Sequence, residues 1–261
     1  MGLKHRLYAW STYCQKKLMP GLRYCQEIYE EVLEAEVRPG SDWLDLGCGW
    51  HVLPEWRLDA ERRLVDRCGL VAGIDYDLPS LRKHRTIPHL VRGDLNWLPF
   101  RDQAFDLVTS DMVLEHVEHP DAVFREVARL LKPGGRFVFH TVSVYAYATL
   151  VGRVVPDALH GPLIRLVDDR DEADVFPAFY RVNRPREIPA LAARTGFRLL
   201  RLRMLVSSPR LRIVPPLVPL ELLFTRLLMT DRLKMWRPNF IAILEKQPLA
   251  EPAALAEVAH P

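Results

Sequence analysis

A short apolar run that ends in an acid and a glycine turn limits what this chain can fold into more than any other feature. The run Ser41–Leu46 is too short for a helix, and it predicts a strand buried on both faces of a sheet, with Asp45 near its C-terminal end. Gly47 and Gly49 follow at once and allow a turn tight enough for the backbone to approach a ligand. A helix is then expected over residues 54–67.

Three later runs repeat this pattern of apolar residues followed by an acid. Residues Leu70–Asp75, Leu90–Leu95 and Phe105–Asp111 each predict a buried strand with a carboxylate at or near its end. In a doubly wound sheet the carboxyl ends of the parallel strands share one edge, where ligands bind. Asp75 would lie beside the first glycine turn, where a carboxylate can hold the two hydroxyls of a ribose.

The order and spacing of these motifs carry a family resemblance. The residues concerned are Asp45–Gly49, Gly73–Asp75, Gly93–Leu95, Leu98–Phe100, Phe105–Val108, Leu114–Val117 and Leu131–Gly135. Together they resemble the class I S-adenosylmethionine (SAM) methyltransferases, and among these the small-molecule enzymes of ubiquinone and menaquinone biosynthesis. The resemblance implies a Rossmann-like α/β fold with a doubly wound seven-stranded sheet, mostly parallel with an antiparallel last strand.

The resemblance also implies SAM as the cofactor and suggests which residues contact it. They lie in the glycine turn, at the ends of the next two strands and after the fourth strand: Asp45, Gly47, Cys48, Gly49, Asp75, Tyr76, Asp94, Leu95, Ser110, Asp111 and Met112. Two of these acids have plain structural alternatives. Asp94 could simply form a turn after Gly93, and Asp75 could cap a helix, although Asp77 ahead of Leu78-Pro79 is the better cap.

The segment after Gly49 departs from the family pattern. His51 stands where a third small residue often follows, and Val52 stands where the dinucleotide fingerprint needs its third glycine. This counts against a nicotinamide-dependent oxidoreductase, which remains one rival interpretation. The other rival is a protein that binds SAM without catalytic turnover.

Two histidines are candidate general bases for an O or C acceptor. His116 follows the fourth strand, and His140 ends the predicted fifth strand Arg136–Thr141. The alternative for His116 is that Glu115-His116 merely fixes the loop. The acid–amide pair of metal-dependent catechol methyltransferases is missing, so we expect no metal.

The acceptor is expected to be an apolar or aromatic small molecule that resembles a quinol, polyketide or glycolipid. Long segments on the ligand edge of such sheets often form the acceptor pocket. The segment Ser143–Pro185 contains aromatic, cationic and amide side chains suited to this role: Tyr145, Tyr180, Arg181 and Asn183. It also contains Tyr147 and Phe176.

We expect three parts along the chain. N-terminal helices over Leu3–Leu18 and Arg23–Ala35 would cover the cofactor cleft, and a flexible tail would end the chain. The expected boundaries are 1–38 for the helices, 39–246 for the methyltransferase domain with acceptor-side insertions at 143–185 and 204–237, and 247–261 for the tail. In the second insertion, an apolar helix over Leu217–Leu233 fits core packing, a homodimer surface or peripheral membrane contact.

Composition excludes some other classes of function. A formal net charge of +3 over 261 residues does not indicate nucleic-acid binding. The four cysteines show no C-x-x-C pair, so free thiols in a reducing, cytoplasmic setting are expected. No uninterrupted apolar run reaches the ~18 residues of a transmembrane helix.

Overall fold

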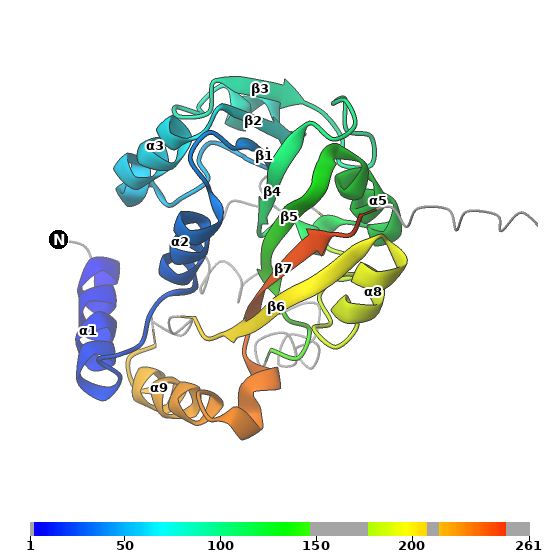
Figure 1. Ribbon diagram of the computed structural model, residues 1–261. Coiled ribbons are helices and arrows are strands. Elements are labelled where there is room, and N and C mark those ends of the chain that lie inside the picture. The colour runs from blue at the N-terminus through cyan, green and yellow to red at the C-terminus, as the bar shows by residue number, and fades with distance from the viewer. Residues whose placement is uncertain (1–2, 147–176, 208–213, 249–261) are drawn as a thin grey trace, which may run out of the picture.

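A seven-stranded sheet organises the computed structural model, which describes residues 3–146, 177–207 and 214–248 (Figure 1). The strand order is β3-β2-β1-β4-β5-β7-β6, and β7 runs antiparallel to both of its neighbours. This confirms the predicted fold class. The strands are β1 Asp42–Leu46, β2 Leu70–Asp75, β3 His89–Arg92, β4 Phe105–Asp111, β5 Leu131–Val142, β6 Phe197–Leu205 and β7 Asn239–Lys246.

The helices lie on both faces of the sheet and at its carboxyl edge (Figure 1). The α-helices are α1 Leu3–Leu18, α2 Cys25–Glu36, α3 Leu58–Arg67, α4 Leu78–Leu81, α5 Pro120–Leu130, α8 Ile188–Arg194 and α9 Leu217–Leu228. Short 3₁₀ helices are η1 Glu55–Arg57, η2 Leu114–His116 and η4 Asp231–Trp236. The predicted Leu217–Leu233 helix is therefore too long, because α9 ends at Leu228 and η4 continues the chain. In the described part of the chain, no helix combines the length and hydrophobicity needed to cross a membrane.

Alternation along the strands divides the core into two layers. Trp43 of β1 pairs in register with Val71 and Leu107, and these side chains pack with α2 and α3. The next residue, Leu44, belongs to the opposite layer together with the inward faces of α5 and α8. Both faces of β1 are buried, as its continuous apolar run predicts.

The start of β5 differs from the prediction. We expected this strand to begin at Arg136, but β5 begins at Leu131, directly after α5. The pairing with β4 shifts between Phe105↔Leu131 and Leu107↔Arg136, so a bulge absorbs the extra residues, with Gly134 at a φ of +74°. Lys132 within the bulge donates to Asp42 and Asp106 at 2.8 and 2.7 Å, which fastens β5 to β1 and β4.

The N-terminal helices take different positions. Helix α2 covers the sheet face that carries Trp43, whereas α1 contacts α9. Of the expected tail, the structure describes only Gln247 and Pro248, and most of the first insertion also lies outside the described residues, including Tyr147 and Phe176.

Candidate active site

The glycine turn joins the end of β1 to the end of β2. The amides of Gly47 and Cys48 donate to the carbonyl of Ile74 at 2.7 and 3.2 Å. Gly47 has a φ of +67°, and a Cβ there would overlap the side chain of Val113. Gly49 has a φ of +52°, and a Cβ there would meet nothing within 4 Å. The backbone at Gly49 is therefore open to a ligand, while Gly47 is fixed by packing.

Asp75 is held beside this turn by two backbone amides. Its Oδ2 accepts from Gly49 at 2.8 Å and its Oδ1 from Asp77 at 2.7 Å. The carboxylate is partly exposed, so each oxygen keeps capacity for a further donor. Asp77 caps α4 by accepting from Ser80 at 2.9 Å, which confirms that Asp77, not Asp75, is the helix cap.

The path of the loop after Gly49 depends on Glu61, a buried acid of α3 that the sequence motifs do not mark. Glu61 of α3 is fully buried, and its Oε2 accepts from the amides of Val52 and Leu53 at 2.9 and 2.8 Å. Its other oxygen accepts from the Thr86 hydroxyl. Glu61 thus fixes the backbone of the loop at Val52 and Leu53. This is the loop in which His51 replaces the third small residue of the family pattern. The one sequence signal is an acid on the apolar side of an amphipathic helix.

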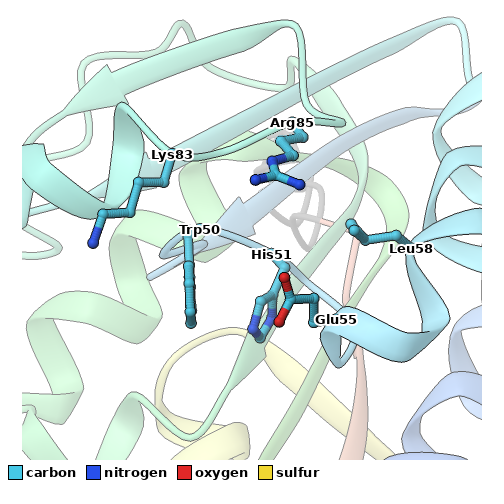
Figure 2. A pocket seen from close by; sticks show the side chains of 6 residues that line it. All are labelled: Trp50, His51, Glu55, Leu58, Lys83 and Arg85. Atoms are coloured by element: carbon cyan, nitrogen blue, oxygen red, sulfur yellow. The ribbon is translucent and has the colours of Figure 1, made fainter.

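Trp50 and His51 leave the turn as a stacked pair with ring centroids 5.2 Å apart. They line a small cavity of about 80 Å³ together with Glu55, Leu58, Lys83 and Arg85, shown in Figure 2. Lys83 lies 5.6 Å from the centroid of the Trp50 ring. This cavity is far too small for a nucleoside, and it lies on the α3 side of the glycine turn.

The third strand end holds Asp94 in a local turn. Asp94 is exposed, and its Oδ1 accepts from the backbone and side-chain nitrogens of Asn96 at 2.9 and 2.8 Å. Leu95 packs half-buried against the core, and Tyr76 is exposed after β2. Asp94 therefore forms a turn in this structure, as one of the two interpretations predicts. A contact with adenine would have to use the lone pairs of Asp94 that Asn96 does not occupy.

A buried polar chain lies between β1 and β4. Trp43 donates to Thr109 at 2.7 Å, and the Thr109 hydroxyl donates to Asp45. Burial raises the pKa of Asp45 well above its usual range, and Asp111 raises it further. Tyr29 of α2 is buried nearby, and burial with the neighbouring Asp45 likewise raises the pKa of its phenol. The side chain of Asp45 is thus buried below the glycine turn and is not exposed at the surface of the turn.

The segment after β4 brings Asp111 against the end of β5. The Asp111 Oδ1 lies 2.6 Å from Nδ1 of His140, and the amide of Met112 donates to the His140 carbonyl at 2.9 Å. Burial lowers the pKa of His140, but the Asp111 charge and hydrogen bond outweigh it and raise the pKa to about 10. His140 is therefore an imidazolium at neutral pH, and it has no lone pair with which to act as a base.

This pair has a consequence for stability. An unfolded histidine has a pKa of about 6.5, so the stabilisation from His140 is complete below that pH and is lost as pH rises toward 10. We expect the free energy of unfolding to fall by up to about 1.4 kcal/mol between pH 7 and 8. Urea denaturation of wild type and His140→Gln at both pH values measures this, and an equal pH dependence in the two proteins would contradict it.

His116, the other candidate base, has a different environment. Its Nδ1 lies 2.8 Å from the carbonyl of Pro177, and since a carbonyl only accepts, Nδ1 carries the proton. In the neutral ring the lone pair then lies on Nε2. The neighbouring Glu115 is buried and accepts from Thr141 at 2.8 Å, so it fixes the loop.

The predicted acceptor residues differ in their exposure to solvent. Asn183 is fully buried, and its Nδ2 donates to Thr141 and to the Val142 carbonyl, both at 2.8 Å, which favours a structural role. Tyr180 and Arg181 are exposed, and the amide of Tyr180 donates to the Glu115 carbonyl at 3.0 Å. Tyr145 is half-buried just after β5. Tyr180 therefore lies beside η2, the element that carries His116.

Comparison with known proteins agrees with this geometry. Residues 44–139 match a protein family described as a methyltransferase domain. Over this range the chain is similar to methyltransferase domains, as the motifs in its sequence predict. Over 146 residues it is 32% identical to a demethylmenaquinone methyltransferase of Corynebacterium kroppenstedtii, covering 54% of this chain and 60% of that protein. The chain spans between 30% and 60% of the length of the curated relatives that it matches, one of which is an uncharacterized 37.1 kDa protein of Streptomyces fradiae.

Solved structures share the fold at low identity. A chain from a complex between the Trm112 methyltransferase activator and a methyltransferase of Haloferax volcanii has a TM-score of 0.56 at 17% identity, covering 96% of this chain and 100% of that one. The [4+2]-cyclase SpnF has a TM-score of 0.50 at 17% identity, covering 93% and 94%. A cyclase with the same fold means that the fold alone does not fix the reaction.

Proposed function

We propose that the chain transfers a methyl group from SAM to an O or C atom of an apolar or aromatic small molecule. The observation that carries this is the Asp75 carboxylate, bonded to the Gly49 amide at the carboxyl edge of the sheet. At such an edge, a carboxylate can bind the ribose hydroxyls of a nucleoside, and an open glycine backbone can approach the charged group attached to it.

The residues present fit a cofactor of this kind. Gly49 leaves its backbone open, Asp75 is partly exposed, and the buried hydroxyl of Ser110 has no hydrogen-bond partner among the described residues. Asp75 would hold the ribose hydroxyls, and residues 47–49 would support the methionine half. Asp94 and Leu95 would meet the adenine, with Tyr76 against its face.

SAM, when bound, supplies an electrophilic methyl group on a sulfonium. The chain's own contribution is to orient the two reactants and exclude water. Asp111, held by His140, and Met112 would line the methionine side. His116, whose ring is oriented by the bond between its Nδ1 and the Pro177 carbonyl, would accept a proton from an acceptor hydroxyl.

The acceptor class rests on exposed aromatic and cationic side chains. Tyr180 and Arg181 are exposed beside η2, and Tyr145 follows β5. Such groups bind a ring and an anionic substituent. The relative from Corynebacterium kroppenstedtii is named as a demethylmenaquinone methyltransferase, which supports a quinol-like acceptor. Radiolabelled methyl transfer from SAM into a bacterial lipid extract, with the product identified by mass, tests the proposal.

Replacing His116 by asparagine separates catalysis from binding. If the acceptor is a hydroxyl, we expect the turnover rate to fall by about 100-fold, the usual contribution of a general base. SAM affinity should stay within about twofold. The control is His119→Asn, an exposed histidine three residues away. Equal rates for both variants would assign His116 to the loop alone.

SAM binding without methyl transfer is the second candidate function, because a [4+2]-cyclase has the same fold and the fold alone does not fix the reaction. It predicts that SAM binds normally while no labelled product forms from any fraction of the extract. Product formation that requires His116 or Asp75 excludes it.

A further inference from the structure

Helices α1 and α9 leave an apolar surface exposed to solvent at the ligand edge of the sheet. Helix α9 connects the end of β6 to the start of β7, and Asn239 at that start pairs with Val142 at the carboxyl end of β5. The helix pair therefore lies at the edge where the parallel strands end (Figure 1).

One face of α9 is buried and the opposite face is not. Val218, Leu222 and Leu228 pack against Met19 and Leu22. The outer face exposes Leu220 by 62%, Leu223 by 66% and Leu227 by 53%, together with Phe224. The spacing i, i+3, i+4, i+7 makes this a continuous stripe on one side of the helix. Helix α1 and η4 also carry exposed aromatic side chains, Trp10 and Tyr13 on α1 and Trp236 on η4.

The same elements concentrate positive charge. Residues 3–18 and 217–237 contain eight Lys and Arg but two Asp and Glu, a formal charge of +6, whereas the whole chain carries +3. Of the two acids, Glu221 is buried. Exposed cations among the described side chains here are Arg6, Lys16, Lys17, Arg226, Arg232 and Lys234.

We propose that this α1–α9 surface docks on an anionic membrane. Exposed leucines with tryptophan and tyrosine beside cations are the composition of an interfacial helix surface, where apolar groups enter the headgroup region and cations meet anionic lipids. A second copy of the chain fits less well, because a twofold interface would place the same positive surface against itself. Docking at this edge of the sheet would place the proposed acceptor side of the site next to the membrane.

Co-sedimentation of the full chain with vesicles tests this without any activity measurement. We expect binding to phosphatidylcholine vesicles that contain about 30% phosphatidylglycerol, and at least about tenfold weaker binding to pure phosphatidylcholine. Raising the salt from about 0.05 to 0.5 M should weaken binding by a similar factor. Because the readout is vesicle binding, failure here leaves the methyl-transfer proposal intact, and the reverse also holds.

Matched variants locate the surface. Leu223→Ser with Leu227→Ser, and separately Lys16→Glu with Lys17→Glu, should each lower the partition coefficient at least about tenfold. Two control variants change residues outside this surface. Arg62→Glu with Arg63→Glu makes the same change of charge on α3, and Leu70→Ser removes an exposed leucine at the start of β2, at the opposite edge of the sheet. Both controls should bind within about twofold of wild type. Circular dichroism confirms folding of each protein.

Three results would overturn the proposal. The first is no binding of the wild type to the anionic vesicles, and the second is equal losses in the control variants. The third is a concentration-dependent dimer in sedimentation velocity that the Leu223→Ser, Leu227→Ser variant abolishes, without vesicle binding. That last result would assign the surface to a second copy of the chain.

Discussion

Replacing Gly47 by alanine is expected to lower the free energy of unfolding by about 2–4 kcal/mol and to remove measurable SAM binding. Two costs add at this position. An alanine at a φ of +67° is strained, and its Cβ would overlap Val113, which enters from the segment after β4. Relief of that overlap would move either the glycine turn or the segment that carries Asp111. Urea denaturation and calorimetric titration with SAM measure the two effects.

Gly134→Ala is the matched control, because Gly134 has a φ of +74° and an added Cβ there meets nothing within 4 Å. It isolates the backbone strain, about 1–2 kcal/mol, and should leave SAM affinity unchanged. Adding Val113→Ala to Gly47→Ala should recover part of the lost stability. Equal destabilisation by Gly47→Ala and Gly134→Ala would show that the contact with Val113 contributes nothing.

Replacing Asp75 by asparagine is expected to weaken SAM binding by about 10–30-fold. A hydrogen bond to a charged group is worth about 1 kcal/mol more than a neutral one, and two ribose hydroxyls would each lose that difference. Asparagine also retains only one acceptor for the amides of Gly49 and Asp77, so a small loss of stability accompanies the change. Isothermal titration calorimetry with SAM gives the affinity directly.

Asp77→Asn is the control for this variant, since Asp77 lies in the same loop and caps α4 through Ser80. Asparagine caps a helix as well as aspartate does, so stability and SAM affinity should both stay close to wild type. A folded Asp75→Asn protein with unchanged affinity would remove Asp75 from the site.

The strands of the sheet were predictable because each one is marked by residues within or next to the strand itself. Buried parallel strands need continuous apolar runs, and in β1, β2 and β4 an acid lies at or next to the carboxyl end, so these strands end where the sequence indicates. The cap at Asp77 was predictable for the same reason, because Leu78-Pro79 directly follows it.

Features that depend on contacts between distant segments were not predictable. The bulge at the start of β5 is set by its register with Phe105 and Leu107, and a pattern of Pro133-Gly134-Gly135 alone indicates a turn. The pairing of His140 with Asp111 follows from the register of β5 on β4, and it turns a candidate base into a charged group. Glu61 likewise gains its role only once α3 lies beside the glycine turn.

Calorimetric titration of the wild-type chain with SAM and, separately, with NAD tests the central claim most directly. The glycine turn with Asp75 beside it predicts SAM binding with a dissociation constant of roughly micromolar size, and no measurable heat with NAD. The third glycine that a dinucleotide needs is replaced by Val52, which is buried against Glu61. Binding of NAD without binding of SAM would contradict the account.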